Sequence, residues 1–109
     1  MSDRELLEAA ARAIDLWPSP EPFEHVQARW NPLVHDGDAF RLAVEMQMEI
    51  AINLFSVSAS STDGCDIQDI EQNGDDARAA ARRAIVTVAG LHWRGQLTVR
   101  AGLAAPPEE

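Results

Sequence analysis

The side chains best suited to chemistry lie in one short stretch, WNPLVHDGDAFRLAV. Asp36 and Asp38 stand two positions apart there, and Asn31 and His35 precede them. Carboxylate and amide oxygens are ligands that Mg²⁺ and Ca²⁺ prefer, so a divalent-cation-dependent enzyme that uses this loop is one hypothesis. Such a site needs about six oxygen ligands, and the longer calcium-loop pattern that ends in a glutamate is absent. Asp36 and Asp38 are therefore weak candidates for metal ligands.

The same stretch has a structural interpretation that needs fewer assumptions. Pro32 and Gly37 are turn-forming residues, and either Asp36 or Asp38 is placed to cap a helix that begins near Ala39. We therefore interpret the stretch first as a corner between a strand and a helix.

A second group of acidic residues follows within residues 63–76, with no basic residue among them. If the strand predicted there alternates, Asp69 and Glu71 face one side and Asp66 faces the other, so the carboxylates are split rather than convergent. A sheet edge protected by charge is the simpler interpretation. The acids are Asp63, Asp66, Asp69, Glu71, Asp75 and Asp76.

Other catalytic patterns are missing from the sequence. His25, His35 and His92 fall in three different predicted elements, and neither H-x-x-x-H nor H-E-x-x-H spacing occurs. Cys65 is the only cysteine, and the aspartates beside it disfavour a reactive thiolate. There is no G-x-S-x-G elbow and no glycine-rich phosphate loop. We therefore expect no catalytic residue, no cofactor and no enzymatic activity.

Composition excludes further classes of function. The chain carries 18 acidic residues against 9 basic ones, all of them arginine, for a formal net charge of −9. Such a surface repels phosphate backbones, so direct nucleic-acid binding is not expected. The acidic N-terminus is unlike a signal peptide. The longest apolar candidate, IAINLF, is far shorter than the roughly 18 residues of a membrane span. The sequence predicts an intracellular protein that makes no contact with a membrane.

Hydrophobic periodicity predicts the elements that position these residues. Ser2 opens an S-x-x-E capping box at the start of a helix from Asp3 to Leu16. The proline-rich PSPEP ends that helix, and the alternating FEHVQARW that follows predicts a half-buried strand over residues 23–30. A second, more buried helix begins near Ala39.

Strands and a closing helix are expected in the second half. The nearly continuous apolar run EIAINLFSVS, residues 49–58, predicts a central strand covered on both faces. Asp63-Gly64 favours a tight hairpin turn into a weaker strand, and Asp75 or Asp76 caps the helix that follows. The short alternating piece QLTVR offers one extra C-terminal edge strand.

This order of elements, α-β-α-β-β-α, predicts an α/β (α+β) domain. We expect a three-layer α/β/α sandwich with a small, mainly antiparallel sheet, because the apolar run needs cover on both faces. A two-layer α+β arrangement is the alternative. The chain is long enough for one core, so residues 1–105 are expected to form a single domain and residues 106–109 a frayed tail.

Two stretches of the chain resemble a known family. WNPLVHDGDAFRLAV is similar to the signature of the phage ABA-sandwich domain family, small proteins of tailed phages and prophages. ARAAARRAIVTVAG resembles that family's closing A-x-R-R-A-I-V segment, and ELLEAAARA resembles its first helix. The resemblance spans roughly residues 3–92 and implies an α-β-α layered fold with no established activity; the tail after His92 is longer than the family pattern. The matching residues are Trp30, Asn31, Pro32, Leu33, Asp36, Gly37, Asp38, Leu42, Arg82, Arg83, Ala84, Ile85 and Val86.

The leading functional hypothesis is a phage or prophage accessory protein that acts by protein–protein interaction. Its partner would be a phage or host protein, or a second copy in a homo-oligomer, in the cytoplasm of the bacterial host or in the virion. Trp17 and Trp93 stand at helix ends, where each either closes the core or anchors an interface. The alternative is an acidic inhibitor that mimics nucleic acid to occupy a DNA-binding enzyme, which requires acids in rows on one surface.

Overall fold

The computed structural model describes residues 2–62 and 67–104, with side chains as far as residue 95. The α+β class and the antiparallel sheet are confirmed, while the order of elements is α-α-α-β-β-β-α. The elements are α1 (Asp3–Ala13), α2 (Phe23–Arg29), α3 (Asp36–Glu45), β1 (Met48–Ile52), β2 (Ser56–Ser61), β3 (Gln68–Gln72) and α4 (Ala77–Ala104).

The sheet has three antiparallel strands in the order β1-β2-β3. Ile50 pairs with Ala59, and Ala59 pairs with Asp69, so these three residues share one face of the sheet. Val57 and Ala59 of β2 are buried on this face. The opposite face is open along its described residues, where Ile70 is 58% exposed.

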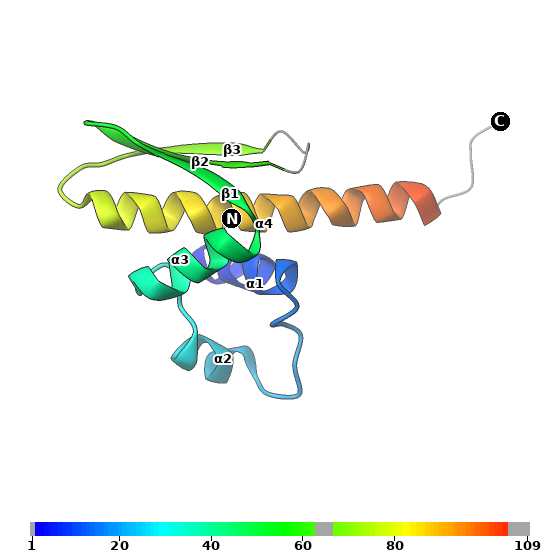
Figure 1. Cartoon of the computed structure of the whole chain (residues 1–109). Helices are drawn as coiled ribbons and strands as arrows, with labels where there is room; N and C mark the ends of the chain where they lie inside the picture. Colours follow the sequence, from blue (N-terminus) through cyan, green and yellow to red (C-terminus); the bar gives the residue numbers. More distant parts are fainter. Residues whose placement is uncertain (1, 63–66, 105–109) are drawn as a thin grey trace.

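All the helices lie on one side of the sheet. Figure 1 shows the sheet above α4, with α1 and α3 on the far side of α4 and α2 outermost. The layers are therefore sheet, α4, and then α1 with α3, in place of the expected helix cover on both faces. The serine-rich face of β2 explains the difference, because side chains such as Ser58 can be solvated.

Close packing of small residues holds α1 against α4. Ala10, Ala11, Ala84 and Ala89 are completely buried. At Gly90 an added Cβ would lie 3.1 Å from Leu6 Cδ1 of α1, so glycine allows this close approach of the two helices. The core extends from this contact to α2, α3 and the inner face of the sheet through Leu7, Val26, Leu42, Val57, Val86 and Val88.

The predicted helix ends are confirmed where local capping was visible. The Ser2 hydroxyl accepts a hydrogen bond from the Glu5 N–H at 3.2 Å, and the Ser2 N–H donates to Glu5 Oε1 at 3.3 Å. These bonds to Ser2 lower the pKa of Glu5. Asp76 Oδ1 accepts from the N–H groups of Arg78 and Ala79 at the start of α4, which confirms one of the two expected caps. The first helix ends at Ala13, three residues earlier than expected.

The strand predicted over residues 23–30 is wrong, because this segment forms α2. Phe23 and Val26 are its buried residues, and their spacing of three fits a helical face as well as the alternation fits a strand. The extra strand predicted at QLTVR is also wrong, since α4 continues through it to Ala104. Gly95 just before it lowers helix propensity by about 1 kcal/mol, which does not end a helix that is already formed.

The single central strand predicted over residues 49–58 is wrong as well. The chain turns in the middle of the apolar run, where Asn53 N–H donates to the Ser56 carbonyl at 2.8 Å, and Ile52 pairs with Val57. The Asn73 side chain supports this turn by donating to the Leu54 carbonyl at 3.0 Å. β1 is therefore an edge strand, and β2 is central.

The hairpin between β2 and β3 is confirmed by their antiparallel pairing. Its expected Asp63-Gly64 turn lies outside the described residues, as do Cys65, Asp66 and the tail at 106–109.

Candidate functional site

The first candidate site is the acidic corner between α2 and α3, where the Asp38 side chain forms hydrogen bonds within the protein. The residue is 7% exposed, and its Oδ2 accepts a hydrogen bond from the Asn31 N–H at 2.9 Å. Its Oδ1 accepts from Arg41 Nη2 at 2.6 Å. The expected capping role is wrong, because the helix begins at Asp36 and its cap residue is His35, which makes no side-chain capping bond. Asp38 instead reaches back from the first turn to hold the preceding loop.

Asp36 faces α4 and binds arginine. Arg82 Nη1 donates to Asp36 Oδ1, and Arg78 Nη1 lies 3.8 Å from Asp36 Oδ2. Arg82 also donates from Nε to the Leu33 carbonyl at 2.9 Å, and its side chain is only 16% exposed. The two stretches that carry the family resemblance therefore meet at this point, although 49 positions separate Arg82 from Leu33.

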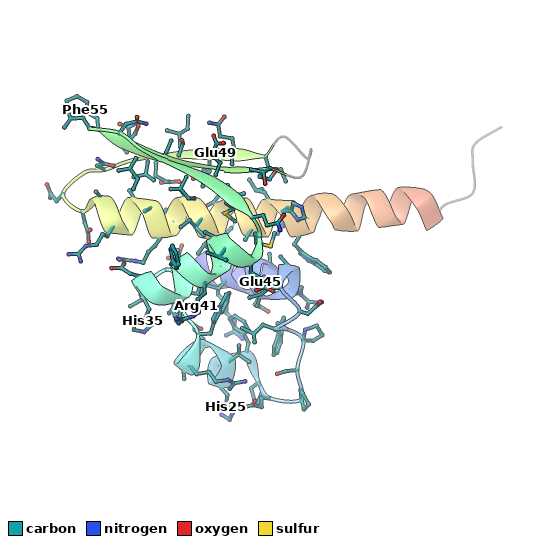
Figure 2. All side chains as sticks on the ribbon, in the orientation of Figure 1. His25, His35, Arg41, Glu45, Glu49 and Phe55 are labelled. Atoms are coloured by element: carbon teal, nitrogen blue, oxygen red, sulfur yellow. The ribbon has the colours of Figure 1, made fainter. Side chains whose placement is uncertain are left out.

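The corner has the geometry of a structural joint. Both carboxylates already accept from arginine, and within residues 2–62 and 67–104 no three histidine, cysteine or acidic side chains gather as a metal site. Figure 2 shows His25 on α2 and His35 at the start of α3, well apart, while His92 is buried on α4. The structure thus brings Asp36 and Asp38 to arginines and not to each other.

A second group of titratable residues lies between β3 and α4. Asp69 and Glu71 are on the same face of β3, opposite Arg83, which also binds Asp3 of α1 at 2.8 Å. Burial raises the pKa of Asp69 from 3.8 to about 7, and the neighbouring Glu71 adds to the rise while Arg83 opposes it. Between about pH 4 and pH 7, the folded protein therefore holds a proton on Asp69 that the unfolded chain has already released.

This shift makes stability depend on pH. Because the folded-state pKa is raised, the contribution of Asp69 is fully present below about pH 4 and is lost as the pH rises towards 7. Asp69→Asn keeps a neutral side chain at every pH, so we expect it to be more stable than wild type by about 1 kcal/mol at pH 8, a value reduced for solvent screening. Urea unfolding from pH 4 to pH 8 measures the difference, with Asp75→Asn as the control for loss of one charge. A constant difference at all pH values would contradict the expectation.

The strongest candidate is an apolar groove of about 530 Å³ between α3, β1 and the first half of α4. Phe40 and Val44 come from α3, Ile50 and Ile52 from β1, and Ile85 from α4. Figure 1 shows β1 crossing the front of α4 from the turn that it shares with α3, so that the two elements diverge from that turn.

Several large apolar side chains that line this groove are exposed to solvent. Phe40 is 68% exposed, Val44 is 59% exposed and Ile52 is 73% exposed. At the turn between β1 and β2, Leu54 is 81% exposed and Phe55 is 74% exposed. Apolar residues gathered in one place on a surface mark interaction sites.

One end of the groove is polar. Arg78 and Asp36 line it there, together with Arg82. The Arg78 side chain is 82% exposed, and its Nη1 lies 3.8 Å from Asp36 Oδ2. Asp36, the carboxylate among the described lining residues, is bound by Arg82.

The tryptophans divide between core and surface. The Trp17 ring packs edge-to-face on Phe23, with centroids 5.1 Å apart and an interplanar angle of 74°. Trp17 and Trp30 are both partly buried against the core, so Trp17 serves core closure. Trp93 is half-buried on α4, and its role at an interface stays a prediction.

Several arginines form ion pairs with acidic residues on the helical surface. A nucleic-acid mimic requires rows of acids on one surface, and that alternative stays a prediction. Besides the two contacts of Asp36 with Arg78 and Arg82, the ion pairs among the described residues include Arg4–Glu24 (2.6 Å), Arg29–Glu21 (2.9 Å), Arg41–Asp38 (2.6 Å), Arg83–Asp3 (2.8 Å), Arg4–Glu8 (3.6 Å) and Arg94–Glu5 (4.0 Å).

Comparisons of the chain with protein-family models, curated proteins and solved structures give no match. Among the helices that the structure describes, none combines the length and apolar character needed to cross a membrane. The function of the protein is therefore inferred from the geometry of the groove.

Sequence reasoning missed the groove because it assigned the apolar residues of α3 to the core. The core stripe of α3 is formed by Ala39, Leu42 and Ala43. Phe40 and Val44, four positions apart, form a second stripe that points away from it. Two apolar stripes on one short helix were the available signal.

Proposed function

We propose that this protein acts by binding another polypeptide and that the groove between α3, β1 and α4 is the docking surface. The observation that carries the proposal is the exposure of Phe40, Val44 and Ile52 along this one groove. Removing such side chains from water against a partner is favourable, at about 25 cal/mol per Å² of apolar surface. No catalytic activity, resident metal or cofactor belongs to the proposal.

The expected partner segment is an extended strand with apolar residues at alternate positions. Among the strands that the structure describes, β1 pairs with β2 alone, so alternate peptide groups of Met48–Ile52 face away from the sheet and can bind an added strand. Every second side chain of that strand would point into the space between β1 and α3. Apolar side chains there would contact Phe40 and Val44.

The proposed setting is that of an accessory protein of a tailed phage or prophage, acting in the host cytoplasm or in the virion. The resemblance of WNPLVHDGDAFRLAV and ARAAARRAIVTVAG to the phage ABA-sandwich family supports this origin. The bond from Arg82 to the Leu33 carbonyl gives both stretches a shared structural role, which is what a family signature without catalytic residues requires.

A displayed library of random peptides tests the docking surface. We expect wild type to select peptides with apolar residues at alternate positions, and Val44→Asp to bind them at least about tenfold more weakly, or about 1.4 kcal/mol. The reason is that the new carboxylate would lose its hydration inside an apolar groove.

The control is Val34→Asp, which makes the same change at a residue of equal exposure, 59%, outside the groove. It should bind the selected peptides as wild type does. Selected peptides with no alternating pattern, or equal binding by Val44→Asp, would reject the groove as the docking surface.

A further inference from the structure

The two edge strands of the sheet differ in their protection against pairing. β3 carries Glu71 on the face towards α4, next to the partly buried Asp69, and an inward-pointing charge such as that of Glu71 discourages an added strand. β1 has one charged residue, Glu49, which is exposed on the open face (Figure 2). Its inner row is apolar and consists of Met48, Ile50 and Ile52. β1 is therefore the edge that accepts a partner.

Charge permits a second copy of this acidic chain at the groove. Two copies with a net charge of −9 repel each other in general. The charged residues that line the groove are Asp36, Arg78 and Arg82, one acid and two bases, so the lining is positive by one. The apolar faces of two copies can meet there without bringing uncompensated carboxylates together.

We infer that the strand that fills the groove is β1 of a second copy, paired antiparallel with β1 about a two-fold axis at Ile50. The inference rests on the proposed function, because it names the partner of the same groove. Ile50 is the middle residue of Met48–Ile52, so this axis pairs all five residues. Glu49 then faces Ala51 of the second copy. An axis at Glu49 would instead set two carboxylates directly opposite each other, which is unfavourable.

Sedimentation velocity of the full chain over a wide concentration range tests the inference. We expect a monomer–dimer equilibrium whose dissociation constant falls severalfold from low to high salt, because salt screens the repulsion between two acidic chains. Val44→Asp should raise the dissociation constant at least about tenfold, while Val34→Asp should leave it unchanged. Circular dichroism checks that both variants keep their helices. A dimer that Val44→Asp does not weaken, or that salt dissociates, overturns the inference.

Disulfide trapping tests the register in a Cys65→Ser background. Ile50→Cys should form a linked dimer under mild oxidation, because the two residues face each other at the axis. Ala51→Cys should not, because its counterpart lies diagonally across the pair, beyond the Cα separation of about 7 Å that a disulfide can span. Preferential linkage through Ala51→Cys overturns the proposed axis.

The two proposals fail separately. A wild-type chain that stays monomeric at every concentration, while library peptides bind its groove, overturns the second-copy inference and leaves the proposed function intact. Absence of both the dimer and peptide binding overturns both.

Discussion

Replacing Leu7 by alanine should lower the free energy of unfolding by about 3 kcal/mol. Leu7 is 2% exposed on α1, in the core that α1 shares with α4. The same core contains fully buried alanines such as Ala10 and Ala89, which have no spare side-chain length to fill a cavity. The loss would therefore combine the transfer energy of the removed atoms with the energy of an unfilled cavity.

Urea unfolding followed by circular dichroism measures this effect. Leu91→Ala is the matched control, because it makes the same chemical change on α4 at a residue that is 39% exposed. It should cost less than about 1 kcal/mol. An equal loss in the free energy of unfolding for both variants would show that the packing of Leu7 between α1 and α4 contributes no more to stability than an exposed leucine does.

Asp38→Ala should destabilise the fold by about 2 kcal/mol. The change removes the acceptor of the Asn31 N–H, a part-buried group that would lose its hydrogen bond, and it removes the carboxylate that binds Arg41. Asp38→Asn should cost about half as much, since its amide oxygen can still accept from Asn31 while the charge attraction to the exposed Arg41 is lost.

The same measurement with added Mg²⁺ separates the structural role of the corner from cation binding. If Asp38 serves only to bind Asn31 and Arg41, the urea midpoint of unfolding of wild type and of both variants should be the same with and without Mg²⁺. A wild-type midpoint that rises with Mg²⁺, and fails to rise in Asp38→Ala, would restore the hypothesis of a cation site at this corner.

Substitutions of exposed and of buried apolar residues on α3 should have different effects. Leu42 is 1% exposed and belongs to the core, whereas Val44, two positions later, is 59% exposed and lines the groove. A charge at Val44 should therefore change association and leave the fold intact. A substitution can test binding at the groove without unfolding the protein when the residue both lines the groove and is exposed to solvent.

Local signals in the sequence were sufficient for part of the fold. The Ser2–Glu5 capping box marks the start of α1, and Asp76 marks the start of α4, because capping depends on residues within one turn. The α+β class and the pairing of β2 with β3 also follow from periodicity along the chain. The corner at residues 30–38 was expected between a strand and a helix, whereas it joins the helices α2 and α3. Its hydrogen bonds were not predicted, since Asp38 and Arg82 bind backbone groups whose positions depend on the folded chain.

The sequence by itself thus determined where α1 and α4 begin, the α+β class and the pairing of β2 with β3, all of which depend on contacts between near neighbours in the chain. Tertiary structure decided the rest. Phe23 and Val26 suit a strand or a helix until a core is present to bury them. The run at residues 49–58 is divided by a turn that Asn73, far along the chain, supports. The groove exists only because α3, β1 and α4 meet in space, and no local pattern specifies which apolar side chains such a meeting leaves in water.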